Sequence, residues 1–514
     1  MQASPPLPKR LLLGVVLACL VYFLAGLLPI GVEQTYGARM AAAITVFVAT
    51  CWLSQALPLA AASLLPLCLM PLLGVMPIGR SAIAYAHPII WMFFGGFVLA
   101  IGIERWNLHR RIALRIIQRV GCEPRRLVLG FMLACGFLSM WLNNTSTTLM
   151  LLPIALALIH SMSASGALKE QDRANFAFAL LIGIAYAASI GGTGTPIGTA
   201  PNALFLSSYA ALERSGAPPV TFATWMMVAV PMVVILIPVV WWLLTRVLAP
   251  IGRSNPQASE VLSREAQSLA PIDRAECSML GLFLLAALLW TTRRDLDLGS
   301  WLTIPGWWRL LPVPDAEFIG DGAVAIFVAL LSFLLPSGRA PKQALMDWSH
   351  AQKLPWDILF LIGGGIAIAD AFNYTGLAGA IGAALQPVVA SLHPLGVVLL
   401  VGAVMTFLTE FTSNTATTSL MLPILIAASQ AAGLDPRLTM LPATLAASCA
   451  FMLPIATPPN AIVFSSGLFP MGRMARAGLW INFVAIIIIT ALTWWVAVPL
   501  WGIDPYNSPP WLVP

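Results

Sequence analysis

Charged residues are scarce in this sequence. Asp, Glu, Lys and Arg make up 9% of its 514 residues and hydrophobic residues 59%, whereas roughly 25% of the residues in soluble domains are charged. Apolar runs of about 17–25 residues, each long enough to cross a bilayer, recur along the whole chain. The composition excludes an ordinary soluble domain and predicts an integral membrane protein.

Clusters of metal-ligating and catalytic residues are also missing. The seven cysteines show no CxxC or Cys/His spacing, so neither a metal site of that kind nor a disulfide framework is expected. No carboxylates or histidines gather as a membrane-embedded transferase would require. The basic residues form no soluble domain that could bind nucleic acid. We therefore expect neither an enzyme nor a nucleic-acid partner.

The apolar runs predict an all-α integral membrane fold with about eleven transmembrane helices. They lie near residues 11–30, 40–57, 60–77, 88–104, 175–210, 225–248, 277–292, 318–336, 355–372, 438–468 and 477–500. Two further apolar segments, 127–162 and 395–432, are too long for one helix and are interrupted by polar residues. Each is predicted to be a re-entrant helical hairpin.

The basic residues predict the orientation of this topology. Most of the 27 lysines and arginines fall on one side, which predicts a cytoplasmic N-terminus in the inner (plasma) membrane of a bacterium. The basic segment 106–120 is amphipathic and is predicted to lie as a helix along the inner leaflet. A polar linker at 252–273 separates the two halves of the chain.

A polar sequence motif, which we call the polar word, occurs twice, once in each predicted hairpin. It reads Asn-Asn-Thr-Ser-Thr-Thr at 143–148 and Ser-Asn-Thr-Ala-Thr-Thr at 413–418, and each copy is followed by Leu-Pro-Ile. A second match lies downstream. Eight of 14 positions are identical between 195–208 and 453–466, including the pattern Pro-Ile-x-Thr-x-Pro-Asn-Ala. The chain therefore contains an internal repeat.

The repeat is predicted to be inverted, because an odd number of spans (five) separates the two hairpins. One hairpin would enter from the cytoplasm and the other from outside, with their tips meeting near the middle of the bilayer. The chain then divides into N-terminal scaffold spans, a first repeat, connecting spans, a second repeat, and a last span with the C-terminal tail. These parts cover residues 1–86, 87–210, 211–353, 354–468 and 469–514.

The repeated words predict a transport site. Polar groups inside a bilayer are costly unless they are covered by protein or line a cavity. The half-helix after each tip presents backbone N–H groups that attract an anion, so two such ends would hold a substrate with two negative groups. Carbonyls freed at the Pro-x-x-Thr-x-Pro-Asn breaks would bind a cation such as Na⁺. The alternative is ordinary helix contacts and kinks, and the two-fold doubling argues against it.

Glu410 directly precedes the second word, inside an otherwise apolar hairpin. An intramembrane carboxylate is a functional candidate, and it could couple protons, balance a cation or hold backbone N–H groups of the hairpin. Its counterpart in the first repeat is Met140, so it cannot belong to a symmetric site. We favour the structural role.

At these words the chain resembles the divalent anion:sodium symporter family, which contains dicarboxylate, citrate and sulfate carriers. The resemblance rests on the triplets Asn143-Asn144-Thr145 and Ser413-Asn414-Thr415 and on the Pro-x-x-Thr-x-Pro-Asn words at 196–202 and 454–460. Together with the span pattern it covers essentially the whole chain. It implies eleven spans, two oppositely directed hairpins, a scaffold that forms a homodimer, and elevator-like movement of a transport domain.

The resemblance also implies functional residues. A first Na⁺ site would use Ser139, Asn143, Asn144 and the carbonyl of Gly198. A second would use Thr409, Thr412, Asn414 and the carbonyl of Ala456. The substrate carboxylates would meet Asn144, Thr145, Asn414 and Thr415, with Thr199 and Thr457 behind them. No organic cofactor is implied.

One residue departs from the family pattern, because Asn143 stands where the family usually has serine. This change puts strict sodium coupling at the first site in question. The leading hypothesis is a secondary transporter that carries a C4-dicarboxylate or related divalent anion together with Na⁺. The alternative is a sodium-independent dicarboxylate exchanger of the same fold, and an ion channel is a third class that the inverted hairpins disfavour.

Overall fold

The computed structural model describes residues 7–25, 36–164, 170–252, 262, 267, 269–297, 303–339 and 343–512. Its regular structure is almost entirely helical, and the predicted all-α class is confirmed. One antiparallel pair of two-residue strands, β1 (Leu296–Asp297) and β2 (Thr303–Ile304), lies in the loop after the seventh predicted span. The linker predicted at 252–273 falls mostly outside the described residues.

Seven helices precede the first hairpin. They are α1 (Leu7–Ala25), α2 (Tyr36–Ser54), α3 (Leu59–Ser63), α4 (Leu65–Leu72), α5 (Ile78–Ala84), α6 (Pro88–Arg105) and α7 (Leu108–Val120). The last of these is the predicted amphipathic helix. It buries Leu114 and Ile117 and exposes Arg115 and Arg119, and it packs against the first arm of the hairpin that follows.

Each predicted hairpin segment forms two helices with the polar word at their junction. The first consists of α8 (Pro124–Ser139) and α9 (Asn144–Ala164), and the second of α19 (Pro394–Thr409) and α20 (Asn414–Ala431). The connecting residues 140–143 and 410–413 have the same sequence of turns and bends. The two tips are therefore alike in backbone as well as in sequence.

The Pro-Asn words interrupt a helix in both repeats. A loop at 193–199 separates α10 (Glu170–Gly192) from α11 (Ala200–Glu213), and a loop at 448–457 separates α21 (Arg437–Ala447) from α22 (Pro458–Phe464). Proline at the first or second position of each new helix supplies no N–H to extend the preceding one. Each hairpin tip lies against the loop that breaks a helix in its own repeat.

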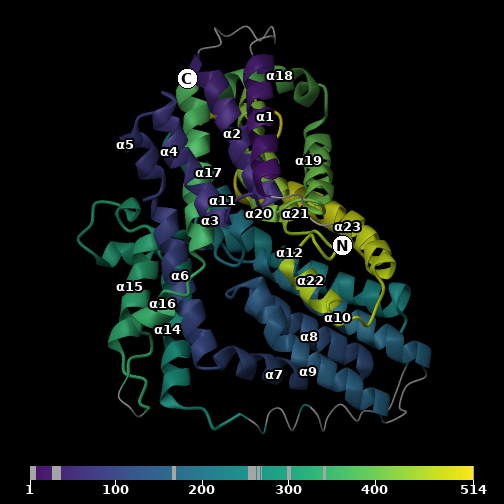
Figure 1. Cartoon of the computed structure of the whole chain (residues 1–514). Helices are drawn as coiled ribbons and strands as arrows, with labels where there is room; N and C mark the ends of the chain where they lie inside the picture. Colours follow the sequence, from purple (N-terminus) through teal and green to yellow (C-terminus); the bar gives the residue numbers. More distant parts are fainter. Residues whose placement is uncertain are drawn as a thin grey trace.

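The remaining helices connect the repeats or follow them. Between the repeats lie α12 (Phe222–Trp242), η1 (Leu243–Leu248), α14 (Arg274–Thr291), η3 (Trp307–Leu310), η4 (Ala316–Phe318), α15 (Asp321–Leu334) and α16 (Trp348–Ala351). The second repeat opens with α17 (Trp356–Thr375) and α18 (Leu377–Ala390). The chain ends with α23 (Met471–Leu492), η5 (Thr493–Ala497), α24 (Val498–Leu500) and η6 (Pro510–Leu512). In Figure 1, α1, α2, α18 and α19 stand in the upper part, whereas α7 to α10 lie across the lower part.

The helix α18 is the repeat counterpart of α7, and the sequence did not predict it. It is bent by 116° from α19 across a short break, and it packs against α20, whereas α7 packs against α8. The signal was missed because α18 carries no charged residue, whereas the arginines of α7 marked its amphipathic face.

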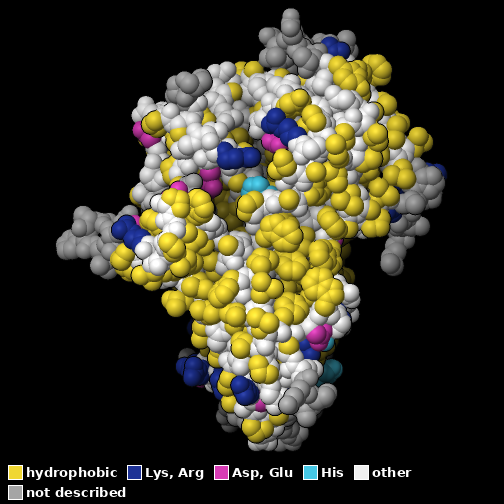
Figure 2. All heavy atoms as spheres, turned by 90° about the vertical axis from the view of Figure 1, so that its left-hand side faces the viewer, with side chains coloured by type: hydrophobic (Ala, Val, Ile, Leu, Met, Phe, Trp, Pro, Cys, Tyr) yellow, Lys and Arg dark blue, Asp and Glu magenta, His cyan; other side chains and the backbone are white. Residues whose placement is uncertain are grey.

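Among the described residues, eight helices are long and apolar enough to cross a membrane, or nine if the bent pair α18–α19 counts as one span. This count does not test the predicted number of about eleven, because the segments Leu59–Leu72 and Asp321–Leu334 form apolar helices shorter than the length it requires. Figure 2 shows a broad hydrophobic band on the surface, with Lys and Arg side chains gathered below it and around a hollow above it. An apolar band between charged ends is typical of a protein that spans a bilayer.

Candidate functional site

The first hairpin tip is built around Asn144, the first residue of α9. Its side-chain oxygen accepts a hydrogen bond from the hydroxyl of the buried Ser139 at 2.6 Å, which joins the end of α8 to the start of α9. The side-chain oxygen of Asn143 accepts one from the backbone N–H of Thr145 at 2.8 Å. Asn143 therefore caps α9, and its amide oxygen is engaged at the helix end.

The loop 193–199 approaches this tip so closely that glycine is needed. A Cβ atom on Gly192 would lie 2.6 Å from Oδ1 of Asn144, and one on Gly198 would lie 2.4 Å from the Gly192 carbonyl oxygen and 2.9 Å from that of Met140. The hydroxyl of Thr195 donates to the same Met140 carbonyl. The residues predicted for the first Na⁺ site thus gather where the tip meets the loop.

Each loop is held in shape by the asparagine of its repeated word. Nδ2 of Asn202 donates to the backbone carbonyls of Gly192, Thr193 and Thr195 at 2.7–3.2 Å. Nδ2 of Asn460 donates to the carbonyls of Ala450 and Leu453 at 3.0 and 3.1 Å. We had assigned no role to these two asparagines, although their identical position in both copies was the signal.

The second tip repeats the plan with different side chains. Ser413 accepts a hydrogen bond from the Ala416 N–H at 3.5 Å and so caps α20. The hydroxyl of Thr412 lies 2.7 Å from that of Thr417 and donates a hydrogen bond to a backbone carbonyl of α19. Oδ1 of Asn414 is buried and has no hydrogen-bond partner within the described residues. A buried oxygen without a donor is suited to a cation.

Glu410 connects the second tip to the loop 448–457. It is fully buried, and its two carboxylate oxygens accept hydrogen bonds at 2.7–3.1 Å from the backbone N–H groups of Phe451, Met452 and Leu453 and from Nδ2 of Asn482. The structural role that we favoured fits this geometry. The expected partners were wrong, because the N–H groups that need an acceptor belong to the broken helix and not to the hairpin.

The four threonines predicted to contact substrate stand at the beginnings of helices. Thr145 and Thr415 are the second residues of α9 and α20, and Thr199 and Thr457 directly precede α11 and α22. The helix α11 packs against α20 and α21, and α22 packs against α9 and α10. Each repeat thus places the helix after its loop against the hairpin arm of the other repeat.

The two repeats are covered unequally. Ile197 in the first loop is buried, and a Cβ atom on Gly96 of α6 would lie 3.2 Å from it. Its counterpart Ile455 is 81% exposed. At the tips, Trp141 packs edge-on to Phe283 at 4.7 Å between ring centroids, whereas its counterpart Phe411 is 75% exposed. The first repeat rests against neighbouring helices on a face that the second leaves open.

The chain is similar to several known proteins. The family model described as "Sodium:sulfate symporter transmembrane region" matches residues 9–501. The chain is 39% identical to a sodium-dependent dicarboxylate transporter, SdcS, of Staphylococcus saprophyticus, over 90% of this chain and 86% of that protein. It is 36% identical to the protein of the same name from Staphylococcus aureus, over 99% of this chain and 95% of that one.

A solved structure shares the fold. The YdaH transporter of Alcanivorax borkumensis, described as having an unusual topology, aligns with 90% of this chain and 99% of its own at a TM-score of 0.54. Sequence identity is 14%, so the likeness concerns the architecture alone.

Proposed function

This chain belongs to the sodium:sulfate symporter family of divalent anion carriers, and on that premise we propose that it is a secondary active transporter that moves C4-dicarboxylates together with Na⁺. The observation that carries the proposal is the pair of matching hairpin tips, each opening a helix with an Asn-Thr step. The staphylococcal relatives are named sodium-dependent dicarboxylate transporters. Their identity over nearly the whole chain supports the same substrate class here.

The substrate carboxylates would bind at the N-terminal ends of α9 and α20. Asn144 and Thr145 begin the first of these helices, and Asn414 and Thr415 begin the second. Unpaired backbone N–H groups and the helix dipole at such ends attract anions. Thr199 and Thr457 would add hydroxyl donors behind them. Two negative groups can then be held without lysine or arginine at the site.

The cations would sit behind the substrate at each tip. Ser139, Asn144 and the Gly198 carbonyl supply hydroxyl, amide and backbone oxygens to the first group, and Thr409, Thr412, Asn414 and the Ala456 carbonyl supply them to the second. Oxygen ligands of this kind suit a hard monovalent ion. Oδ1 of Asn414, which is buried and has no hydrogen-bond partner in the described part of the chain, supports this assignment.

The geometry of Asn143 favours symport over exchange. Sodium coupling was in question because asparagine stands at this position, where the family usually has serine. Its side chain caps α9 through Thr145, as Ser413 caps α20 through Ala416. The substitution therefore conserves the capping role and leaves the oxygens of Ser139 and Asn144 in place. The asparagine in place of serine at this position therefore no longer argues for a sodium-independent exchanger.

Transport would proceed by elevator-like movement in a homodimer, in a bacterial inner membrane and with the N-terminus in the cytoplasm. The difference in burial between Ile197, which is buried, and its counterpart Ile455, which is exposed, supports such movement. In an inverted repeat, a mobile unit that rests against its scaffold through the first repeat would do so through the second after crossing the bilayer. The exposed face of Ile455 and Phe411 is the surface that would be covered in that second state.

Uptake into proteoliposomes tests the proposal. Labelled succinate should accumulate when an inward Na⁺ gradient is imposed, and replacing Na⁺ by K⁺ should abolish accumulation, because each carboxylate is compensated by a bound cation and not by a basic side chain. Empty liposomes provide the background. Uptake that ignores Na⁺ but requires succinate inside the vesicle would identify an exchanger instead.

A further inference from the structure

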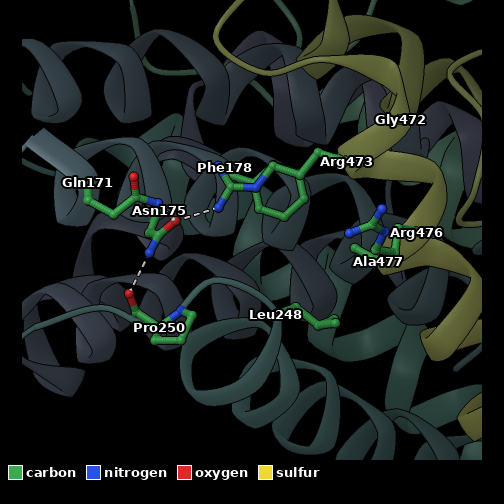
Figure 3. A pocket seen from close by; sticks show the side chains of 9 residues that line it. All are labelled: Gln171, Asn175, Phe178, Leu248, Pro250, Gly472, Arg473, Arg476 and Ala477. Carbon is green, nitrogen blue, oxygen red and sulfur yellow. Dashed lines mark hydrogen bonds between the residues drawn. The ribbon is translucent and has the colours of Figure 1, made fainter.

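A cavity of about 440 Å³ lies at a place where three membrane-spanning helices begin or end, and none of the tip residues lines it. It lies between the start of α10, the end of η1 and the first turns of α23. The predicted topology puts these three helix ends on the cytoplasmic side. Figure 3 shows the lining side chains, of which Asn175, Arg473 and Arg476 are the polar ones central to the argument. The volume falls in the range of small-molecule sites, about 300–1,000 Å³.

One of the two arginines is fixed by a buried amide. A guanidinium nitrogen of Arg473 donates to Oδ1 of Asn175 at 2.5 Å, and the guanidinium carbon lies 4.3 Å from the centre of the Phe178 ring. Asn175 is itself buried, and its Nδ2 donates to the carbonyl of Pro250 at 2.7 Å. Arg473 is thereby held in one orientation at the wall of the cavity.

The described lining of the cavity carries positive charge and no acidic residue. Arg476, one helical turn after Arg473, is exposed, and its side chain reaches toward the cavity from α23 (Figure 3). Within the part of the chain that the structure describes, neither arginine forms an ion pair. Asp172 of α10 accepts a hydrogen bond from the backbone N–H of Gly252. Among the described residues, two guanidinium groups therefore remain available to bind an anion.

An apolar stripe continues from Arg476 along α23. Trp480, Phe483 and Ile487 follow it at helical spacing, and they are 58%, 48% and 63% exposed. Residues four, seven and eleven positions apart lie on one face of a helix. An anion held by Arg476 would thus have, on the same face, a surface that suits hydrocarbon chains. A free inorganic anion would make no use of this stripe.

We propose that this cavity binds the phosphate headgroup of an anionic membrane phospholipid, whose acyl chains lie along the Trp480–Ile487 face of α23. Basic pockets between membrane helices on the cytoplasmic side recognise such headgroups, and a guanidinium matches the geometry of a phosphodiester. The site joins α10, η1 and α23, so the bound lipid would brace the base of the first broken helix. The inference is independent of the transported substrate.

Native mass spectrometry of the full-length protein in detergent tests this site, with dioleoyl phosphatidylglycerol and dioleoyl phosphatidylcholine as probes. The wild type should bind phosphatidylglycerol preferentially, and Arg476→Gln should weaken that binding about fivefold, while Arg476→Lys keeps the charge and most of the affinity. Trp480→Ala should also weaken lipid binding. The matched control is Arg119→Gln, which removes an exposed arginine of α7 on the same predicted side and should leave the affinity unchanged.

Two results would overturn the proposal. If Arg476→Gln binds phosphatidylglycerol as tightly as the wild type, or loses no more than Arg119→Gln does, the cavity is not the site. If inorganic phosphate competes with the lipid at similar concentration, and Trp480→Ala has no effect, the ligand is a free oxyanion. Melting of Arg476→Gln in phosphatidylcholine micelles verifies that the variant is folded.

Discussion

Replacing Asn144 by alanine should lower sodium-driven succinate uptake by about 10- to 100-fold. The amide oxygen of Asn144 accepts from Ser139 at 2.6 Å and lies against Gly192 in the first loop, and in our account it serves both the cation and the carboxylate. Removing it leaves the buried hydroxyl of Ser139 without its partner, which costs about 1–3 kcal/mol. Asn414→Ala should give a similar loss, because Asn414 holds the same position in the second repeat. Initial rates in proteoliposomes at fixed Na⁺ measure both.

A second variant tests the same point without deleting the amide. Gly192→Ala would place its Cβ atom 2.6 Å from Oδ1 and 3.1 Å from Nδ2 of Asn144, so it should displace that side chain and reproduce the loss of uptake. Gly402→Ala is the matched control, since a Cβ atom at that position in α19 meets no atom within 4 Å. Full activity of Asn144→Ala, or equal losses in the two glycine variants, would contradict the assignment.

Replacing Glu410 by alanine should destabilise the protein by about 3–5 kcal/mol. The substitution would leave three backbone N–H groups of the loop 448–457, one buried and two partly buried, without an acceptor, together with the buried amide of Asn482. In our account the same loop would supply the Ala456 carbonyl to the second cation group, so Na⁺ affinity should also fall. Thermal unfolding in detergent, with and without Na⁺, measures both effects.

The repeat supplies the control for Glu410. Met140→Ala changes the equivalent position of the first tip, where the backbone carbonyl and not the side chain bonds to the loop, so no hydrogen bond is lost. Glu410→Gln keeps one acceptor oxygen and should fall between the wild type and Glu410→Ala. A melting temperature of Glu410→Ala equal to that of the wild type would show that the carboxylate is not needed to hold the loop.

The features that local sequence determines were predictable. Asn, Thr and Pro interrupt apolar runs at 143–148 and 413–418 and at the two Pro-Asn words, and helices end or begin there, because those residues disfavour a continuous helix. The arginines of α7 marked an amphipathic helix in the same way. Both hairpins and both broken helices therefore followed from short stretches of the chain.

The features that depend on distant partners were not predictable. Glu410 bonds to N–H groups about forty residues away, and nothing near it in the sequence indicates which loop needs an acceptor. From the family pattern we expected Asn143 to alter a cation site, because that pattern suggests only ion ligands. In the structure its side-chain oxygen accepts a hydrogen bond from a backbone N–H at the start of α9. Apolar composition does not reveal that a segment such as Leu59–Leu72 forms a short helix, so the number of about eleven spans stays a prediction.

The central claim is that the two hairpin tips hold one doubly charged substrate between them. A cryo-electron microscopy map of the protein with succinate and Na⁺ measures this directly. Our account predicts substrate density in contact with Asn144-Thr145 on one side and Asn414-Thr415 on the other, with ion density beside Ser139 and Thr409. Succinate bound elsewhere, or tips separated by lipid or packed side chains, would contradict it.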